Sequence, residues 1–126
     1  PGSPLEELIN RSVPLEPVKR AEFVYNFEPL ENAHRDAASQ GQSNVPNAED
    51  AIDLHYVCFV KDDNHNLWEL DGRRKGPIKL GKLSPDEDML SEKALEMGVK
   101  TFIKREEKGG NGEIRFSLMA LAPTSG

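Results

Sequence analysis

The sequence predicts an α+β fold in which an antiparallel β-sheet is flanked by helices. Two apolar runs, residues 54–60 and 67–71, are rich in β-branched and aromatic residues, and polar turn residues separate them. This pattern is typical of a β-hairpin. Residues 4–38 and the segment after Ser84 instead place apolar residues at helical spacing. Both periods within one short chain indicate a mixed fold.

The N-terminal part is predicted to form three helices. The first covers residues 4–11, after the potential N-cap Ser3, with proline at its first position. The second covers residues 18–27, and an interruption near Pro29 separates it from a third over residues 30–38. Residues 1–3 are of the kind that a cloning site leaves behind, so they carry no functional argument.

Residues 39–50 are predicted to form a surface loop. They show no apolar periodicity, and their glycine, proline, serine and asparagine content is typical of turns. A loop of this length inside a compact domain is more often functional than incidental.

The C-terminal part adds two strands and a helix. After a basic turn at residues 72–77, residues 78–82 are predicted to form a strand. Residues 84–87 read Ser-Pro-Asp-Glu, a capping box with proline at the first position, so a helix is expected to begin there. Residues 114–122 are apolar on both alternating sides, which predicts a central strand.

Composition limits the function classes. The chain has 126 residues, of which 37% are hydrophobic and 30% charged, which fits one small globular domain. A net charge of −6 argues against nucleic-acid binding and favours a basic partner, although ordinary solubilising charge explains it equally well.

Cysteine and glycine usage excludes several kinds of site. One cysteine cannot form an internal disulfide, and one cysteine with three dispersed histidines shows no metal-ligand spacing. The glycines match no nucleotide-binding fingerprint, so no metal and no cofactor is expected. Neither a signal-peptide pattern nor a membrane-spanning run is visible, and a cytoplasmic location without membrane association is therefore expected.

The hairpin brings a histidine close to a carboxylate. A turn centred on Asp63 places His55 directly opposite Asp71, with Cβ atoms roughly 5 Å apart. Asp71 is then expected to accept a hydrogen bond from His55 Nδ1, which leaves Nε2 to exchange a proton with a nucleophile. The alternatives are a structural histidine and an aspartate that only begins a turn. The pair amounts to two thirds of a catalytic triad.

Cys58 is not expected to complete that triad. It lies three residues from His55 on the same strand, so alternation sends the two side chains to opposite faces. A thiol and an imidazole that cannot meet are not a nucleophile and its base. Cys58 is therefore predicted to be buried and inert.

Three segments resemble the C-terminal half of the ubiquitin C-terminal hydrolases, a family of papain-like cysteine deubiquitinases. They are Leu54-His55-Tyr56-Val57-Cys58-Phe59-Val60, then Leu67-Trp68-Glu69-Leu70-Asp71-Gly72-Arg73 with Gly76-Pro77-Ile78, and Arg115-Phe116-Ser117-Leu118-Met119-Ala120-Leu121-Ala122. The similarity extends upstream through residues 34–42 and 46–50. It implies a papain-like α+β fold, of which residues 1–126 form the C-terminal portion of a single domain.

The resemblance also implies an activity. The family hydrolyses bonds after the C-terminal glycine of ubiquitin or a related modifier, using a cysteine nucleophile that precedes these segments. His55 is then the general acid and base, and Asp71 orients it. The nucleophile is expected outside this chain, on a complementary N-terminal half, so the chain alone is expected to be inactive. The matching loop crosses the active-site cleft in the family, which implies a gating role here for Gln40, Gly41, Gln42, Ser43, Asn44, Val45, Pro46 and Asn47.

Two other functions remain open from the sequence. A noncatalytic module that binds ubiquitin without turning it over is one of them. The other is an inactive fragment that only assembles with a complementary half. Both the fragment and the enzyme predict exposed apolar surface where the missing half would pack.

Overall fold

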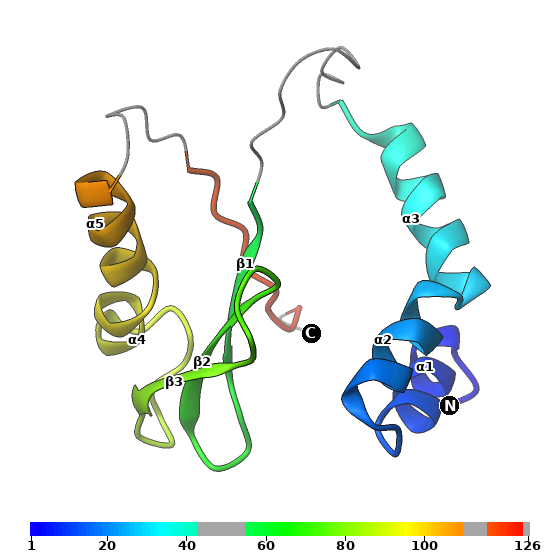
Figure 1. Cartoon of the computed structure of the whole chain (residues 1–126), viewed down its shortest axis with the longest axis horizontal. Coiled ribbons are helices and arrows are strands. Elements are labelled where there is room, and N and C mark those ends of the chain that lie inside the picture. Colours follow the sequence, from blue (N-terminus) through cyan, green and yellow to red (C-terminus); the bar gives the residue numbers. More distant parts are fainter. Residues whose placement is uncertain (43–54, 110–115, 125–126) are drawn as a thin grey trace. The chain divides into compact units, whose positions relative to one another are not determined.

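The protein is described by a computed structural model that covers residues 1–42, 55–109 and 116–124. These residues contain five helices and three strands, which confirms the α+β class (Figure 1). The chain divides into two compact units, Pro1–Ile52 and Asp53–Gly126.

The first unit is helical. It contains α1 (Pro4–Ser12), α2 (Pro17–Tyr25) and α3 (Glu28–Gln40), and each has a proline in its first turn. Proline suits this position because its missing N–H would have no helical partner there. Ser3 caps α1 by accepting a hydrogen bond from the Glu6 amide at 3.1 Å. The three predicted helices are confirmed, and Pro29 is the second residue of the third.

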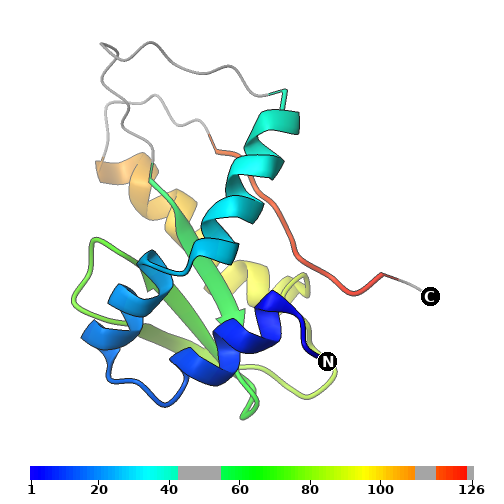
Figure 2. The same ribbon diagram turned by 90° about the vertical axis from the view of Figure 1, so that its right-hand side faces the viewer.

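Within this unit, Arg20 of α2 supplies hydrogen-bond donors for the main-chain carbonyls at the C-terminal end of α1. The guanidinium of Arg20 donates hydrogen bonds of 2.8–3.0 Å to the main-chain carbonyls of Ser12, Val13 and Leu15. These carbonyls lie at a helix end, where main-chain acceptors lack helical partners. Phe27, at the junction of α2 and α3, is buried, and its ring lies 5.4 Å from that of Phe23. Beyond this junction α3 leads away from the α1–α2 pair (Figure 2).

The second unit is built on a three-stranded antiparallel sheet. Its strands are β1 (Val57–Lys61), β2 (Asn66–Asp71) and β3 (Ile78–Lys82), in the order β1-β2-β3. The predicted hairpin and third strand are therefore confirmed.

The predicted register of the hairpin is wrong. Val57, and not His55, pairs with Asp71, because the turn centres one residue later than expected. The reason lies in Asp62, whose main-chain N–H and C=O bond to Asn66 O at 2.9 Å and His65 N at 3.0 Å. His65 takes a positive φ of 67°, which is typical of a three-residue hairpin loop ending in a left-handed residue.

The helical segment after the sheet begins later than predicted. It consists of α4 (Glu92–Met97), capped by Ser91, and α5 (Val99–Gly109). Ser84 and Glu87 form a local turn instead, in which the Ser84 amide donates to Glu87 Oε1 at 2.8 Å. Gly98 separates the two helices. A Cβ there would lie 3.1 Å from both the Phe59 ring and the Ala94 carbonyl, so glycine permits close packing of β1 on this junction.

The core of the second unit lies between one face of the sheet and the two helices. Its buried residues are Leu67, Leu83 and Ala94. Phe59, Leu80, Met89 and Met97 pack against them. The ring of Phe59 also meets that of Phe102 on α5, edge to face, at 6.3 Å. Helices α4 and α5 thus lie along one side of the sheet (Figure 1).

The predicted central strand over residues 114–122 is wrong for residues 116–122, and residues 114 and 115 lie outside the described residues. Residues 116–124 form no strand, and their large apolar side chains are exposed. Phe116 is the least exposed of these side chains, at 46%, and its ring lies 6.1 Å from that of Phe102. Apolar residues on both sides of a segment favour a strand only where layers cover both sides. Within the described residues of the second unit, that cover is missing.

Candidate catalytic site at the open end of the hairpin

His55 and Asp71 meet at the end of the hairpin away from its turn. His55 Nε2 lies 3.0 Å from Asp71 Oδ2. The predicted contact is therefore present, although the two residues are diagonal neighbours and not a direct pair. Because side chains alternate with a period of two, a two-residue change in register leaves both on the same face. Diagonal neighbours remain within reach of a ring side chain.

The nitrogen that meets the carboxylate differs from the prediction. Asp71 contacts Nε2, so Nδ1 is the nitrogen left for a reacting group. The His55 side chain is 22% exposed and that of Asp71 7%. The carboxylate is thus shielded while the ring keeps one accessible edge. A neutral imidazole that donates from Nε2 carries its acceptor lone pair on Nδ1.

Asp71 is held as an anion. Its Oδ1 accepts a hydrogen bond from the Arg73 amide at 2.9 Å. This bond, then the hydrogen bond and charge of His55, and lastly the charge of Arg74 lower the pKa of Asp71 against the opposing effect of desolvation. An ionised, oriented carboxylate is what the orienting position of a histidine pair requires.

A second carboxylate lies beside this pair and was missed from the sequence. Glu69 is 2% exposed, and Arg105 of α5 donates to its Oε1 at 2.9 Å. Arg74 Nε lies 3.6 Å from Glu69 Oε2 and 3.7 Å from Asp71 Oδ2. The available signal was the alternation of β2, which places Glu69 on the inward side with Leu67. A glutamate at an inward position requires a buried cation.

Cys58 lies on the opposite face of β1. The predicted orientation is confirmed, because β1 alternates and His55 and Phe59 share the covered face. The predicted burial is wrong: Cys58 is exposed, and so are its neighbours on that face, among them Tyr56, Val60 and Leu70. The reason is that, among the described residues of the second unit, no layer covers this side of the hairpin. The exposed apolar surface expected of a partial domain is present here.

Comparison with known proteins decides the family. The sequence model described as "Ubiquitin carboxyl-terminal hydrolase, family 1" matches residues 1–104 of the chain. The chain belongs to the ubiquitin carboxyl-terminal hydrolase family. The predicted family and fold class are thereby confirmed.

Curated relatives in this hydrolase family cover the same region. The chain is 38% identical to ubiquitin carboxyl-terminal hydrolase isozyme L1 of Monodelphis domestica and 35% identical to that of Equus caballus. Identity to the Homo sapiens isozyme is 34%. Each match extends over 120 residues, which are 95% of this chain and 49% of the relative. The chain thus spans about half the length of these curated relatives.

The predicted gating loop of this hydrolase family member is only partly described. Gln40 ends α3, which corrects the expected loop start at residue 39. Alanines favour helix, so the helix continues until Gly41, whose amide bonds back to the Ala38 carbonyl at 3.2 Å. Gln42 follows and is exposed. Residues 43–47 of the predicted set lie outside the described residues.

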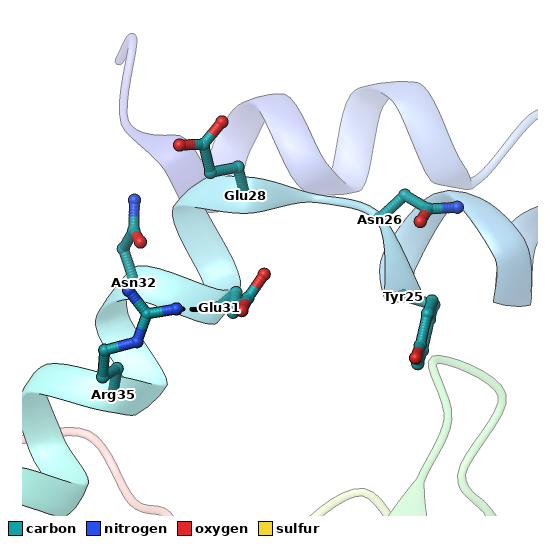
Figure 3. Close-up of a pocket in the computed structure, with 6 residues that line it drawn as sticks. All are labelled: Tyr25, Asn26, Glu28, Glu31, Asn32 and Arg35. Carbon is teal, nitrogen blue, oxygen red and sulfur yellow. Dashed lines mark hydrogen bonds and ion pairs between the residues drawn. The ribbon is translucent and has the colours of Figure 1, made fainter.

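The chain also has a surface pocket of about 570 Å³ in its first unit (Figure 3). Its lining residues are Tyr25, Asn26, Glu28, Glu31, Asn32 and Arg35. Arg35 and Glu31 form an ion pair of 3.0 Å along α3. The lining offers neither a thiol nor an imidazole, so the histidine–aspartate pair remains the candidate catalytic site.

The described residues of this hydrolase family member contain no group of three or more His, Cys, Asp or Glu side chains placed to hold a metal ion. None of their helices combines the length and the apolar character needed to cross a bilayer.

Proposed function

We propose that the chain supplies the general acid/base and its orienter to a thiol-dependent ubiquitin C-terminal hydrolase that cleaves after the C-terminal glycine of ubiquitin. The observation that carries the proposal is the 3.0 Å contact between His55 Nε2 and Asp71 Oδ2. The family to which the chain belongs supports the reaction. The thiol nucleophile is proposed to come from a cysteine outside these 126 residues, on a complementary N-terminal half.

The proposed mechanism assigns the proton transfers to His55. A cysteine thiolate, stabilised beside the protonated imidazole, attacks the carbonyl of the last ubiquitin glycine. His55 gives its proton to the leaving amine or thiol, and a thioester to the enzyme forms. Water then attacks the thioester, His55 takes its proton, and the thiolate leaves. Asp71 holds the ring throughout and stabilises its positive charge.

Cys58 is not the proposed nucleophile. It is exposed on the face of β1 opposite to His55. A nucleophile and its base must come within hydrogen-bond reach of each other, and side chains on opposite faces of one strand cannot do so. The chain alone is therefore expected not to react with a ubiquitin that carries an electrophile at its C-terminus.

Further parts of the proposal concern partners and place of action. The substrate is ubiquitin or a similar modifier, whose basic C-terminal tail suits a chain of net charge −6. Residues 40–47 are proposed to border the groove that admits this tail. The enzyme is proposed to act as a thiol protease of the ubiquitin conjugation pathway in the cytoplasm.

Reconstitution tests the proposal. The chain is mixed with the cysteine-bearing N-terminal half of the Monodelphis domestica relative, and hydrolysis of a fluorogenic ubiquitin amide is followed. Activity is expected from the mixture, and neither half alone should show it. The matched controls are a cysteine-to-alanine N-terminal half and the His55→Ala chain, which should both abolish turnover.

The outcomes separate the candidate functions. Turnover that persists in the His55→Ala mixture contradicts the assigned role of His55. Binding of ubiquitin without turnover in an assembled mixture favours a noncatalytic module. A probe adduct at Cys58 that disappears with His55→Ala overturns the assignment of the nucleophile to another segment.

A further inference from the structure

We infer that Arg74 is a positioning residue of the catalytic pair. Its guanidinium is a counter-ion shared by Asp71 and the buried Glu69, and it thereby modulates the negative charge that Asp71 presents to His55. This inference rests on the proposed function of His55 and Asp71. Arg74 touches neither a reacting atom nor His55 in this arrangement, and acts through Asp71.

The distances place Arg74 between two carboxylates. Its Nε lies 3.6 Å from Glu69 Oε2 and 3.7 Å from Asp71 Oδ2, so it is nearly equidistant from the two. Both distances exceed those of a hydrogen bond, so the attraction is that of charges. The Arg74 side chain is 40% exposed, which leaves it room to approach either carboxylate.

Glu69 explains why a second cation is needed. Arg105 already donates to Glu69 Oε1 at 2.9 Å. Oε2 is buried and accepts no hydrogen bond from the described residues. A buried carboxylate oxygen without a donor is costly, so Arg74 is drawn toward Glu69. The same guanidinium cannot then approach Asp71 as closely as it could without Glu69.

The charges of the cluster balance. Glu69 and Asp71 from β2 face Arg74 from the turn after it and Arg105 from α5, and His55 completes the set just before β1. With a neutral imidazole, the ion pairs named here among the described residues join two anions to two cations. Removing Arg74 leaves one excess negative charge at Asp71, whereas removing the charge of Glu69 leaves one excess positive charge. The two changes must therefore act on Asp71 with opposite signs.

The test follows the side-chain carboxyl carbon of Asp71 by NMR during a pH titration of the 126-residue chain. Arg74→Gln is expected to raise the pKa of Asp71 by roughly half a unit, the size typical of a partly exposed charge a few ångströms away. Arg74→Glu should raise it further, and Arg74→Lys should leave it near the wild-type value. Lys75→Gln is the matched control, because it removes the same charge from the next, exposed residue of the turn.

The opposite change completes the test. Glu69→Gln is expected to lower the pKa of Asp71, because Arg74 is then free to approach it. If this buried substitution unfolds the chain, as amide spectra would show, the three Arg74 variants decide alone. Equal titrations of Arg74→Gln and wild type, or a shift as large in Lys75→Gln, overturn the inference.

Failure of this inference is distinct from failure of the proposed function. The titration needs no nucleophile. If the Arg74 variants leave the pKa of Asp71 unchanged, the result of the reconstitution is not affected. In the reconstituted enzyme, the acid limb of kcat/KM should move in the same direction as the Asp71 titration in Arg74→Gln. An acid limb that stays in place while Asp71 shifts shows that Arg74 has no positioning role in turnover.

Discussion

Two aspartates on the same hairpin begin with the same local motif. Asp62, at the turn, accepts a hydrogen bond from the amide of Asn64, and Asp71, at the open end, accepts one from the amide of Arg73, both at 2.9 Å. Each amide lies two residues after its aspartate, which is an Asx turn. The Arg73 amide is the first cause of the lowered pKa of Asp71, whereas the pKa of Asp62 is lowered first by the bond from Trp68 and only last by the Asn64 amide.

The second oxygen of each carboxylate distinguishes them. Asp62 Oδ2 accepts from Trp68 Nε1 at 2.8 Å and Asn66 Nδ2 at 3.1 Å, which are donors that do not titrate near neutral pH. Asp71 Oδ2 instead faces His55 and Arg74. A closed shell of neutral donors makes Asp62 a structural anchor. A titratable partner gives Asp71 a charge that a reaction can use.

The largest expected difference between the two aspartates is in turnover. In the reconstituted enzyme, Asp71→Asn should reduce kcat by about 10² to 10⁴, because an amide does not stabilise an imidazolium and favours the wrong tautomer. His55→Ala should be at least as damaging, and the double variant little worse than His55→Ala. Steady-state hydrolysis of a fluorogenic ubiquitin amide measures all three.

Asp62→Asn serves as the control for that series, assayed at a temperature where it is folded. It should keep turnover within a few-fold of wild type. Equal losses in Asp62→Asn and Asp71→Asn would remove the distinction between an anchor and a catalytic partner.

Thermal stability should show the opposite order, with the larger loss on substitution of Asp62 and the smaller loss on substitution of Asp71. Asp62→Ala removes the acceptor for two main-chain amides and two side-chain donors of the turn, so the Tm of the chain should fall by roughly 5 °C. Asp71→Asn keeps the shape of its side chain and should lower Tm less. Circular dichroism melts of the two variants give the comparison, and a greater loss in Asp71→Asn would contradict it.

The turn should also weaken in acid over a defined range. The hydrogen bond from Trp68 and then that from the Asn66 amide lower the pKa of Asp62 from 3.8 to about 2. A lowered carboxyl pKa stabilises the fold fully above the unfolded value and loses this effect as pH falls through the folded value. The Tm gap between wild type and Asp62→Asn should therefore narrow between about pH 4 and pH 2. A gap independent of pH would show that Asp62 acts by shape alone.

The smallest effect is expected at Cys58. Cys58→Ser should leave turnover of the reconstituted enzyme unchanged within about two-fold, because this side chain is exposed on the face away from His55. Reaction of the Cys58 thiol with a maleimide should proceed equally in wild type and His55→Ala. A loss of turnover beyond ten-fold in Cys58→Ser would place that face of the hairpin in the mechanism.

The sequence predicts the features that depend on local pattern. The hairpin, the three N-terminal helices and the opposite facing of Cys58 and His55 follow from periodicity. The contact between His55 and Asp71 is present although the predicted register is wrong. The strand pairing differs from the prediction by two residues, and a shift of two keeps both side chains on the same face of the sheet. The register itself depends on the main-chain hydrogen bonds that Asp62 makes across the turn, which no apolar pattern encodes.

Features that depend on residues far apart in the sequence cannot be predicted from local patterns. Glu69 and Arg105 are separated by 36 positions, so their ion pair emerges only when α5 packs on the sheet. Two serines of the second unit that could each begin a helix illustrate the same limit. Ser84 and Ser91 both carry N-cap signals, and Ser91 prevails where Ala94 enters the core. Strand composition in residues 114–122 likewise says nothing about which layer would cover it.

The hydrogen bonds of Lys61 limit how readily its side-chain nitrogen can be acylated. Its ammonium donates to three main-chain carbonyls, those of Ser84, Pro85 and Glu87, at 2.7–3.2 Å. All three of its donors are thereby used. Before this nitrogen can attack an acylating reagent, the end of β1 must detach from the segment that leads to α4. Lys61 therefore reports opening of that junction through its rate of acylation, whereas Lys75 reacts from the closed state.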